Sequence, residues 1–306
     1  MGGGEEGLSL DASAAEAAAP TPRRRRRPRL TTPVLLGLPL GWLVVFLIVP
    51  VVIVALYSVD VLALFPGPHS FALGGWNRLF HEGYMNLFWK SAKMSLIVSA
   101  LVVATAYPLA YFLALSGTRR KYVLLLLLIA PFLTSYLLRV LAWKVILGEH
   151  GVVNSALSSV GLHPLSFLLY SRFAVMLVLG YVWLPFVALP IFVTLDTIDR
   201  RLLEAASDLY ASRLQAFLRV TLPLSMPGVV AAFLFVFIPT VGEFVTPSLV
   251  GGTSGYMYGN QIVDLFQQGF PDWETGAALA LFLIAVISVL TFVFVRFLRV
   301  GEARVA

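Results

Sequence analysis

The sequence predicts an all-α membrane protein with six transmembrane helices, and three observations support this class. Hydrophobic residues make up 59% of the 306 residues and charged residues 12%, whereas a soluble domain carries about 25% charged residues. The apolar residues gather in runs about as long as the ~20 residues that a helix needs to cross a bilayer. The basic residues lie mainly in alternate connections between these runs, which is the charge pattern of a multi-pass protein.

The first 32 residues differ from the rest of the chain. They are rich in Ala, Gly and Glu without apolar periodicity, which predicts a disordered tail, and they end near the basic block Arg23 to Arg29. A secretory or twin-arginine export signal ranks lower, because the next apolar run has the length of a membrane span, no small-residue cleavage site ends it and further spans follow. Nucleic-acid binding also ranks lower, since a basic block beside a span marks the cytoplasmic side. Residues 1–32 are therefore predicted to be a basic cytoplasmic tail, and residues 33–300 a transmembrane domain.

Each apolar run is assigned to one transmembrane helix. Several prolines lie inside these runs, and a proline removes a backbone donor, so that the freed carbonyl must find another partner in lipid. The helices are therefore expected to pack against one another or to line a wet cavity. The predicted spans are 34–58, 94–115, 123–143, 173–195, 228–250 and 276–298.

The positions of Lys and Arg predict the orientation of the chain. Six spans place both termini on the same side of the membrane. With that side cytoplasmic, the inner segments hold 16 of the 22 basic residues, which satisfies the positive-inside rule. The six remaining residues lie on the outer side or at span ends, namely Arg78, Lys90, Lys93, Arg139, Lys144 and Arg172.

One carboxylate, that of Glu243, lies inside a predicted span, and Pro239, Gly242 and Pro247 around it predict a broken helix. An ionisable group in the membrane is costly and is by default a candidate functional site. Cations are attracted to aromatic faces, so Phe244, Tyr181 and Trp183 join Glu243 as the candidate translocation path for a cationic solute. Two alternatives remain open. The span ends earlier and leaves Glu243 at the outer interface, or Glu243 only pairs with a basic residue such as Arg139 or Lys144.

The sequence lacks the motifs of common enzymes and metal sites. It contains no cysteine, and its four histidines are scattered without ligand spacing, so no metal site is predicted. No G-x-x-x-x-G-K-[ST] motif is present to hold the phosphates of ATP, and no catalytic cluster stands out. We therefore expect that the chain is not itself an enzyme and that it binds no cofactor of its own.

The segment 200–223 is a polar insert between two apolar runs. Leu202, Ala205, Ala206 and Leu209 recur at helical spacing and form one apolar face, with Glu204 and Asp208 on the other. A second short helix is predicted after Ser212, which has Gln215 at the capping-box position. Such a pair of amphipathic helices can rest on lipid headgroups or dock into a groove of a cytoplasmic partner, and the acidic residues argue against anionic lipid.

The stretch EAASDLYASRLQAFLRVTLP, from Glu204 to Pro223, resembles the EAA loop of the permease subunits of binding-protein-dependent ABC importers. Tyr210 departs from the family pattern, which has glycine there. A tyrosine in a left-handed turn costs on the order of 1 kcal/mol, so the detailed geometry of the family's turn is not carried over. Further segments are similar to the spermidine/putrescine permeases, among them YPLAYFLA (107–114), PFLTSYLLRVLAWKVIL (131–147), LPFVALPIF (184–192), GEFVTPSLVGG (242–252) and GNQIVDLFQQGFPDW (259–273).

The resemblance implies the fold of a type I ABC importer permease in the inner membrane, with an ATP-driven import function. It implies three kinds of partner: a dimer of ABC ATPase subunits that bind ATP and Mg²⁺, a second and different permease chain, and an extracytoplasmic solute-binding protein. The solute it implies is a polyamine. Iron, sulfate or another small solute is the alternative, followed by a secondary transporter and by a membrane-embedded enzyme or scaffold. The residues assigned to ATPase coupling are Glu204, Ala205, Ala206, Asp208, Leu209, Ala211 and Phe217.

Overall fold

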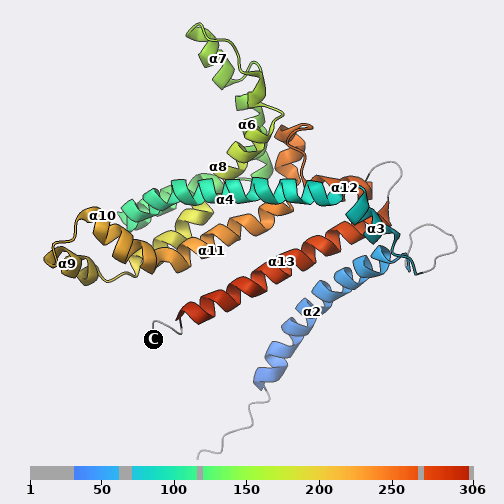
Figure 1. Cartoon of the computed structure of the whole chain (residues 1–306), viewed down its shortest axis with the longest axis horizontal. Helices are drawn as coiled ribbons and strands as arrows, with labels where there is room; N and C mark the ends of the chain where they lie inside the picture. The colour runs from blue at the N-terminus through green and yellow to red at the C-terminus, as the bar shows by residue number, and fades with distance from the viewer. Residues whose placement is uncertain (1–30, 62–70, 116–119, 268–271, 303–306) are drawn as a thin grey trace, which may run out of the picture. The chain divides into compact units, whose positions relative to one another are not determined.

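The chain folds entirely into helices over the part that the structure describes. A computed structural model describes residues 31–61, 71–115, 120–267 and 272–302 (Figure 1), and this range excludes nearly all of the predicted basic tail. The all-α class predicted from the sequence is confirmed. The α-helices are α2 (Thr31–Ser58), α3 (Gly74–His81), α4 (Tyr84–Leu115), α5 (Lys121–Ile129), α6 (Tyr136–Leu147), α7 (Val152–Ser159), α8 (Arg172–Asp196), α9 (Arg200–Asp208), α10 (Arg213–Ala216), α11 (Leu222–Val241), α12 (Tyr258–Gln267) and α13 (Trp273–Glu302).

Short turns of tighter or wider helix join several of these elements. Two are 3₁₀ turns, η1 (Ala130–Leu133) and η2 (Ser166–Leu168). Two are π-helical turns, η3 (Phe217–Thr221) and η4 (Pro247–Gly251). The turn η3 leads directly into α11, and η4 follows a short break after the end of α11. Turns of π-helix are frequent at functional sites.

Five helices in the described ranges are long and apolar enough to cross a membrane. They are Pro39–Ser58, Tyr84–Leu115, Arg172–Asp196, Arg213–Val241 and Trp273–Arg296. The segments Lys121–Leu133 and Tyr136–Ser159 form a sixth span if they are taken together, although they bend by 83° at the break between them. The single span predicted over 123–143 is therefore a bent pair of helical segments. Pro131 lies in the 3₁₀ turn before the break, and Thr134 and Ser135 are extended there.

Two further helix boundaries differ from the expected spans. The helix expected at 94–115 begins at Tyr84, because its polar first turns, with Lys90 and Lys93, extend the helix beyond its apolar part. The helix expected at 228–250 is α11, which begins at Leu222 and ends at Val241. Pro223 lies in the first turn of α11 and does not interrupt the helical backbone, which runs from α10 through the π turn η3 into α11. Gly242 follows the end of α11, so Glu243 lies outside the helix.

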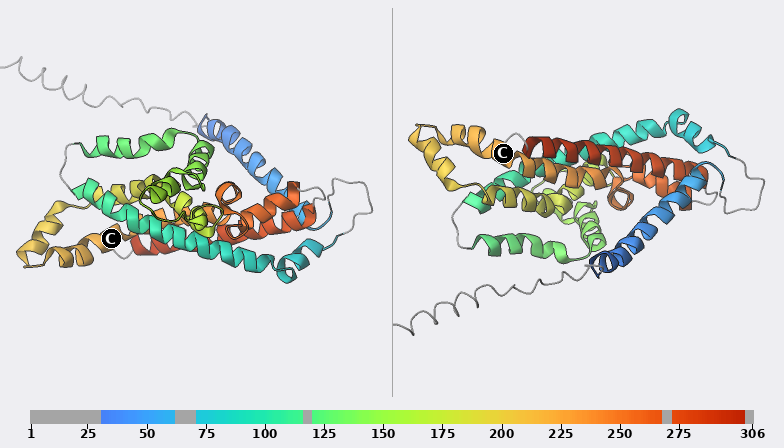
Figure 2. Two further views of the ribbon diagram at one scale, coloured as in Figure 1. Left: turned by 90° about the horizontal axis from the view of Figure 1, so that it is seen from above. Right: turned by 90° about the horizontal axis from the view of Figure 1, so that it is seen from below.

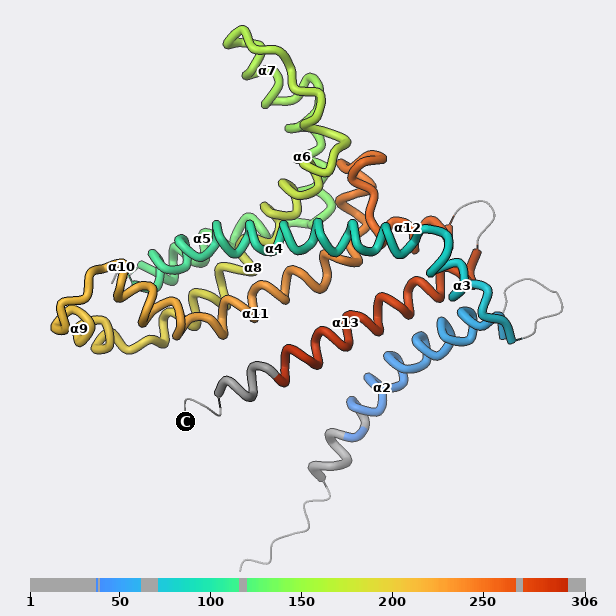
Figure 3. The backbone as a smooth tube through the Cα atoms, in the orientation of Figure 1, coloured from blue at the N-terminus to red at the C-terminus, as the bar shows by residue number. Residues whose placement is uncertain are grey.

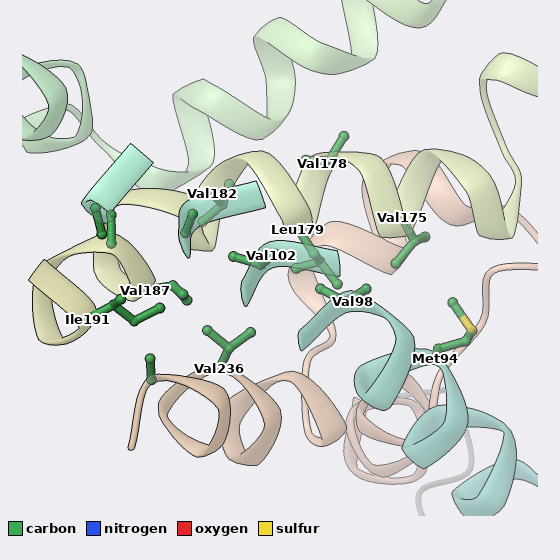
Figure 4. Close-up of a cluster of buried hydrophobic side chains, with 14 of the residues drawn as sticks. Met94, Val98, Val102, Val175, Val178, Leu179, Val182, Val187, Ile191 and Val236 are labelled. Atoms are coloured by element: carbon green, nitrogen blue, oxygen red, sulfur yellow. The ribbon is translucent and has the colours of Figure 1, made fainter. Parts of the chain in front are cut away.

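The chain divides into two compact units, residues 1–51 and 52–306. The described part of the first unit is the N-terminal portion of α2, which has Pro39 and Pro50 within its apolar run. In the second unit, α4, α8 and α11 pack on one another and bury a core of small and branched side chains (Figure 4). Val98 and Val102 of α4 lie beside Leu179 of α8, and Val236 of α11 belongs to the same core (Figure 4).

Small residues allow these helices to approach closely. Ser91, Ser95 and Ser99 form a buried stripe along α4, and the hydroxyls of Ser95 and Ser99 donate to the carbonyls one turn earlier, at 2.9 and 2.8 Å. Gly228 of α11 lies so close to α8 that a Cβ there would come within 2.2 Å of Thr194 Oγ1. In lipid there is no hydrophobic driving force between helices, so close packing through small residues stabilises their contact instead.

A second cluster joins α3, α4, α12 and α13 at the opposite end of the second unit from α9. Leu79, Phe88, Tyr258 and Leu279 form its buried centre. Arg78 of α3 ties this end together by donating hydrogen bonds to Thr275, Asp272 and Glu274 around the start of α13, at 2.6, 3.3 and 2.7 Å. The views in Figure 2 show this end and the α9–α10 loop at opposite ends of the second unit.

Candidate functional site

Glu243 lies in a break between two helical segments. The α11 helix ends at Val241, and the backbone resumes helical geometry only beyond Phe244, leading into η4. The sequence predicted a broken helix here from Pro239, Gly242 and Pro247, and the structure contains that break. A break exposes backbone groups and gives a side chain access to a cavity, which a continuous helix does not.

The Glu243 carboxylate is held through one of its two oxygens. Its Oε1 accepts hydrogen bonds from the Tyr136 hydroxyl at 3.0 Å and from the backbone N–H groups of Val245 and Thr246 at 2.9 and 3.2 Å. The carboxylate therefore caps the free N–H groups of the next helical turn, where negative charge is favoured. Glu243 Oε2 accepts no hydrogen bond from any residue in the described ranges.

Three residues that the sequence analysis did not single out shape this break. Tyr136 of α6 bridges Glu243 and Thr246, with its hydroxyl 2.5 Å from Thr246 Oγ1. Buried Asn260 of α12 donates to the Phe244 carbonyl at 3.0 Å and to Ser248 Oγ at 2.7 Å, so the carbonyl freed by the break is satisfied. Gly259 lies against this backbone, and a Cβ there would meet the Gly242 carbonyl at 2.3 Å. These contacts come from distant parts of the sequence, so no local pattern indicates them.

Glu243 forms no ion pair among the residues that the structure describes. Arg139 instead lies over the Phe132 ring at 5.0 Å, and its buried Nε and Nη1 atoms have no hydrogen-bond partner in the described part of the chain. Lys144 lies over the Tyr170 ring at 5.7 Å. The alternative in which Glu243 only neutralises one of these two cations is therefore not supported by the geometry.

Tyr181 and Trp183 of α8 point to different neighbours. The Tyr181 ring contacts Phe132 and Trp143 of the bent span at 5.1 and 5.3 Å, and it lines an apolar cavity of about 480 Å³ among α4, α6 and α8. The Trp183 ring contacts Phe186 and Phe235, at 6.0 and 6.1 Å. Residues two apart on a helix lie on different faces, and Trp183 does not line the cavity that Tyr181 lines.

The segment after α8 forms the two short helices that the sequence predicted. Asp199 caps α9 by accepting from the Arg201 N–H at 3.0 Å. Ser212 and Gln215 form the predicted capping box at the start of α10, with reciprocal bonds of 3.3 and 2.9 Å. No residue of α9 is buried. The apolar face with Leu202 and Leu209 is therefore not covered by the described part of this chain.

Tyr210 closes α9 in a left-handed conformation. Its φ is +58°, its N–H donates to the Ser207 carbonyl at 2.9 Å, and the Ala211 N–H donates to the Ala206 carbonyl at 3.0 Å. These two bonds make a Schellman motif, in which glycine usually takes the left-handed position. Tyrosine there costs about 1 kcal/mol relative to glycine. The substitution thus changes the energy of this turn but leaves it in the conformation that glycine would adopt.

Phe217 connects this loop to the helix core. Its ring packs edge-on against Tyr107 and Tyr111 of α4, with centroids 5.8 and 5.7 Å apart. The Tyr107 hydroxyl lies 2.8 Å from Ser225 Oγ of α11, just beyond the π turn that contains Phe217. At the other end of the loop, Asp196 closes α8 and pairs with Lys121 of α5. These contacts tie the two ends of the α9–α10 loop to α4, α5, α8 and α11, and Figure 3 shows the chain running from α8 through α9 and α10 into α11.

Comparison with known proteins assigns the family. A family model for the "Binding-protein-dependent transport system inner membrane component" matches residues 30–306. The spermidine/putrescine transport system permease protein PotB of Escherichia coli K12 is 34% identical over 269 residues, which cover 87% of this chain and 97% of that protein. PotB of Haemophilus influenzae is 33% identical over 261 residues, covering 84% and 90% of the two chains.

Solved structures show the same fold. A chain of a bacterial ABC transporter involved in the import of the acidic polysaccharide alginate superposes with a TM-score of 0.64 at 19% identity, covering 96% of this chain and 99% of that one. A chain of the MetNI methionine ABC transporter in an inward-facing conformation superposes with a TM-score of 0.53 at 17% identity, covering 72% and 97%. The chain belongs to the family of binding-protein-dependent transport system inner membrane components, the permease subunits of ABC importers.

Proposed function

We propose that this permease carries a polyamine of the spermidine or putrescine type into the cell. The observation that carries the proposal is the match, over nearly the full length of both chains, to two proteins named as spermidine/putrescine permeases. The likeness to the alginate and methionine importers concerns the fold and supports no particular solute. The polyamine assignment therefore has to be tested by comparing candidate solutes directly.

Glu243 is the residue that we assign to the translocation path. Its Oε1 is engaged with Tyr136 and the backbone, while Oε2 accepts no hydrogen bond from the described residues and is left for an ammonium group of the solute. Phe244 beside it is 43% exposed and offers a ring to a cation or a methylene stem. A path must bind its solute weakly enough to release it, and a carboxylate already shared with three donors meets that requirement.

Tyr181 belongs to the same proposal in a weaker role. Together with Trp143 it lines the apolar cavity among α4, α6 and α8, whose walls can contact the methylene chain of the solute. Trp183 faces Phe186 and Phe235 instead, so we assign it to the packing of α8 on α11.

The α9–α10 loop is the element that we assign to ATPase coupling. The ATPase subunits, which hold ATP and Mg²⁺, would receive α9 in a surface groove, with Glu204, Ala205, Ala206, Asp208, Leu209 and Ala211 at the contact. Two features support this role: the uncovered apolar face of α9, and the packing of Phe217 on α4, which links the loop to the membrane helices. ATP-driven closure of the ATPases would then move α8 and α11 together.

The remaining partners follow from this arrangement. A second permease chain completes the path, and an extracytoplasmic binding protein delivers the solute to the outer loops. Both termini lie in the cytoplasm of a multi-pass inner-membrane protein, as the distribution of Lys and Arg indicates.

An oxyanion is the second candidate solute. The buried Nε and Nη1 atoms of Arg139 have no hydrogen-bond partner among the described residues, and a guanidinium with free donors suits an oxyanion. A molybdenum transport system permease protein, ModB of Azotobacter vinelandii, is 31% identical over 52% of this chain. This candidate predicts stimulation by molybdate or sulfate in place of a polyamine.

The test is a solute-stimulated ATPase assay on the purified complex. The permease is isolated with its ATPase, second permease chain and binding protein, and ATP hydrolysis is measured with spermidine, putrescine, molybdate or sulfate. The proposal expects stimulation by spermidine or putrescine that depends on the binding protein. Stimulation by an oxyanion alone would replace the polyamine assignment with the second candidate.

The coupling role has its own test in two variants, Glu204→Lys and Ala206→Trp. The first reverses a charge on the polar face of α9, and the second places a large side chain on the face that Ala205 and Ala206 keep small. Both are expected to weaken ATPase association about tenfold or more, while membrane insertion persists because no span is altered. Glu149→Lys, an exposed charge reversal in the connection after α6, is the control and is expected to leave ATPase association unchanged. Wild-type association in both α9 variants would remove this loop from the coupling role.

A further inference from the structure

Tyr210 combines an unfavourable backbone conformation with an almost fully exposed side chain. Its φ of +58° lies in the region that favours glycine, and its side chain is 97% exposed. Within the described ranges the Tyr210 side chain makes no hydrogen bond, ion pair or ring contact. The two backbone hydrogen bonds of the Schellman motif hold this turn, but no contact of the Tyr210 side chain within the described ranges helps to offset the unfavourable conformation.

A second left-handed tyrosine provides a comparison. Tyr170 has a φ of +56°, but Lys144 lies over its ring, and its backbone and Cβ pack against Gly252. Its conformation is held by contacts within the chain, as is usual for a non-glycine residue in this region. Tyr210 differs because its ring has no such contact.

We propose that Tyr210 is an aromatic anchor that inserts into the partner ATPase subunit. This inference rests on the proposed coupling role of the α9–α10 loop and adds a specific residue to it. A tyrosine at the tip of a loop presents a large rigid ring with a polar hydroxyl, which is the kind of side chain that dominates protein interfaces.

The surroundings of Tyr210 define the surface that it fits. Leu209 and Leu214 beside it are 82% and 65% exposed, so the tip of the loop is apolar. Asp208 and Glu204 lie on the adjoining α9 helix, also exposed. The loop also carries exposed Arg200, Arg201 and Arg213, so the complementary surface is an apolar pocket with a rim of both charges. The ATPase is the occupant because this loop is the proposed coupling element, and an anionic headgroup layer is the outcome that the test must separate from it.

Three substitutions separate the ring from the backbone. Tyr210→Gly removes the ring and makes the left-handed turn favourable, so it should leave the melting temperature of the isolated permease unchanged or raise it. The same variant should weaken binding of the purified ATPase by about tenfold or more, because an anchor residue is lost. Tyr210→Ala should weaken binding similarly, whereas Tyr210→Phe keeps the ring and should stay within about threefold of wild type. Tyr170→Gly is the matched control and should not change ATPase binding.

The binding measurement uses the permease with the ATPase that co-purifies with the wild-type complex, once in detergent and once in nanodiscs containing phosphatidylglycerol. Wild-type affinity of Tyr210→Gly alongside weak binding of Glu204→Lys would overturn the anchor and leave the coupling role intact. Wild-type affinity of both variants would overturn the two together. Loss of affinity only in the anionic nanodiscs would assign Tyr210 to the membrane surface and would also overturn the proposal.

Discussion

At the scale of single residues, Glu243 has both a structural and a functional contribution. Its Oε1 caps a broken helix and accepts from the Tyr136 hydroxyl, while its charge lies in a segment between two apolar stretches of the chain. A buried or half-buried charge is retained only where geometry and hydrogen bonds support it. The two contributions are separable, because the capping bonds need an oxygen atom and the attraction of a cation needs the charge.

Glu243→Gln separates these contributions. The amide keeps one oxygen for Tyr136, Val245 and Thr246, but it removes the charge. Spermidine transport by the assembled complex should fall about tenfold or more, since a hydrogen bond to a charged group contributes about 1.5–3 kcal/mol. Transport is measured in proteoliposomes that contain equal amounts of assembled complex.

Tyr136→Phe is the matched control for the hydrogen bonds. It removes the hydroxyl between Glu243 and Thr246, leaves the charge in place, and should lower the stability of the complex by about 1 kcal/mol with spermidine transport retained. Unchanged transport in Glu243→Gln would mean that the carboxylate is only a helix cap.

The same scale shows what the sequence could predict about the site. Glu243 stood out because it is a charge in an apolar run, and Pro239, Gly242 and Pro247 indicated the break around it. Tyr136 and Asn260 could not be identified in the same way, because each reaches the break from a distant segment and neither is unusual in its own surroundings. Tyr181 and Trp183 were grouped by proximity in the sequence, and helix geometry separates them.

At the scale of helices, the contact between α8 and α11 depends on Gly228. A Cβ at this position would lie 2.2 Å from Thr194 Oγ1 and 3.0 Å from the Pro190 carbonyl. Thr194 itself donates to that carbonyl at 3.0 Å, so its hydroxyl is held where the Cβ would lie. The α9–α10 loop connects the end of α8 to the start of α11. The distance between these two helices therefore sets the distance between the ends of the loop.

Gly228→Ala should therefore destabilise the protein by about 1–3 kcal/mol, as overpacking does in a well-filled core. Gly180→Ala on α8 is the control, because a Cβ there meets only Val102 Cγ2 at 3.8 Å, an ordinary contact. Thermal unfolding of the purified protein in detergent compares the two, and the expected result is a lower melting temperature for Gly228→Ala alone. Equal melting temperatures for both variants would contradict the close approach of α8 and α11.

The helices also show why their number was easier to predict than their ends. Long apolar runs indicate spans directly, because few other structures bury so many hydrophobic residues. Their ends depend on details that hydropathy does not capture, such as the polar first turns of α4 and the proline in the first turn of α11. The bend of 83° between Leu133 and Tyr136 falls inside an apolar run, and only a proline marked its neighbourhood.

At the scale of the whole molecule, the proposed orientation places the α9–α10 loop in the cytoplasm and the turn after η4 outside. The chain has no cysteine, so introduced cysteines can be labelled without background. Ser207 and Ser254 are both exposed in the structure, and they lie on the two sides of the membrane in the proposed topology. Because both positions are exposed, a cysteine that stays unlabelled is not simply buried within the chain, and its lack of reaction reports the side of the membrane.

An impermeant thiol reagent applied to intact cells should label Ser254→Cys and leave Ser207→Cys unlabelled. Both variants should react after the membrane is permeabilised, which controls for expression and access. Labelling of Ser207→Cys in sealed cells would reverse the orientation and would remove the basis for ATPase coupling through α9. Thr118 lies in the predicted cytoplasmic connection between the second and third spans and would serve as a further labelling position, but it falls outside the described residues.

The central claim is that this permease moves a polyamine at the expense of ATP hydrolysed by its partner. The most direct measurement is uptake of radiolabelled spermidine into proteoliposomes that hold the complete complex, with the loaded binding protein outside and ATP enclosed. The account predicts uptake that requires ATP and the binding protein, that unlabelled putrescine or spermidine competes away, and that molybdate and sulfate leave unchanged. Absence of ATP-dependent spermidine uptake, in vesicles that still import another solute, would contradict it.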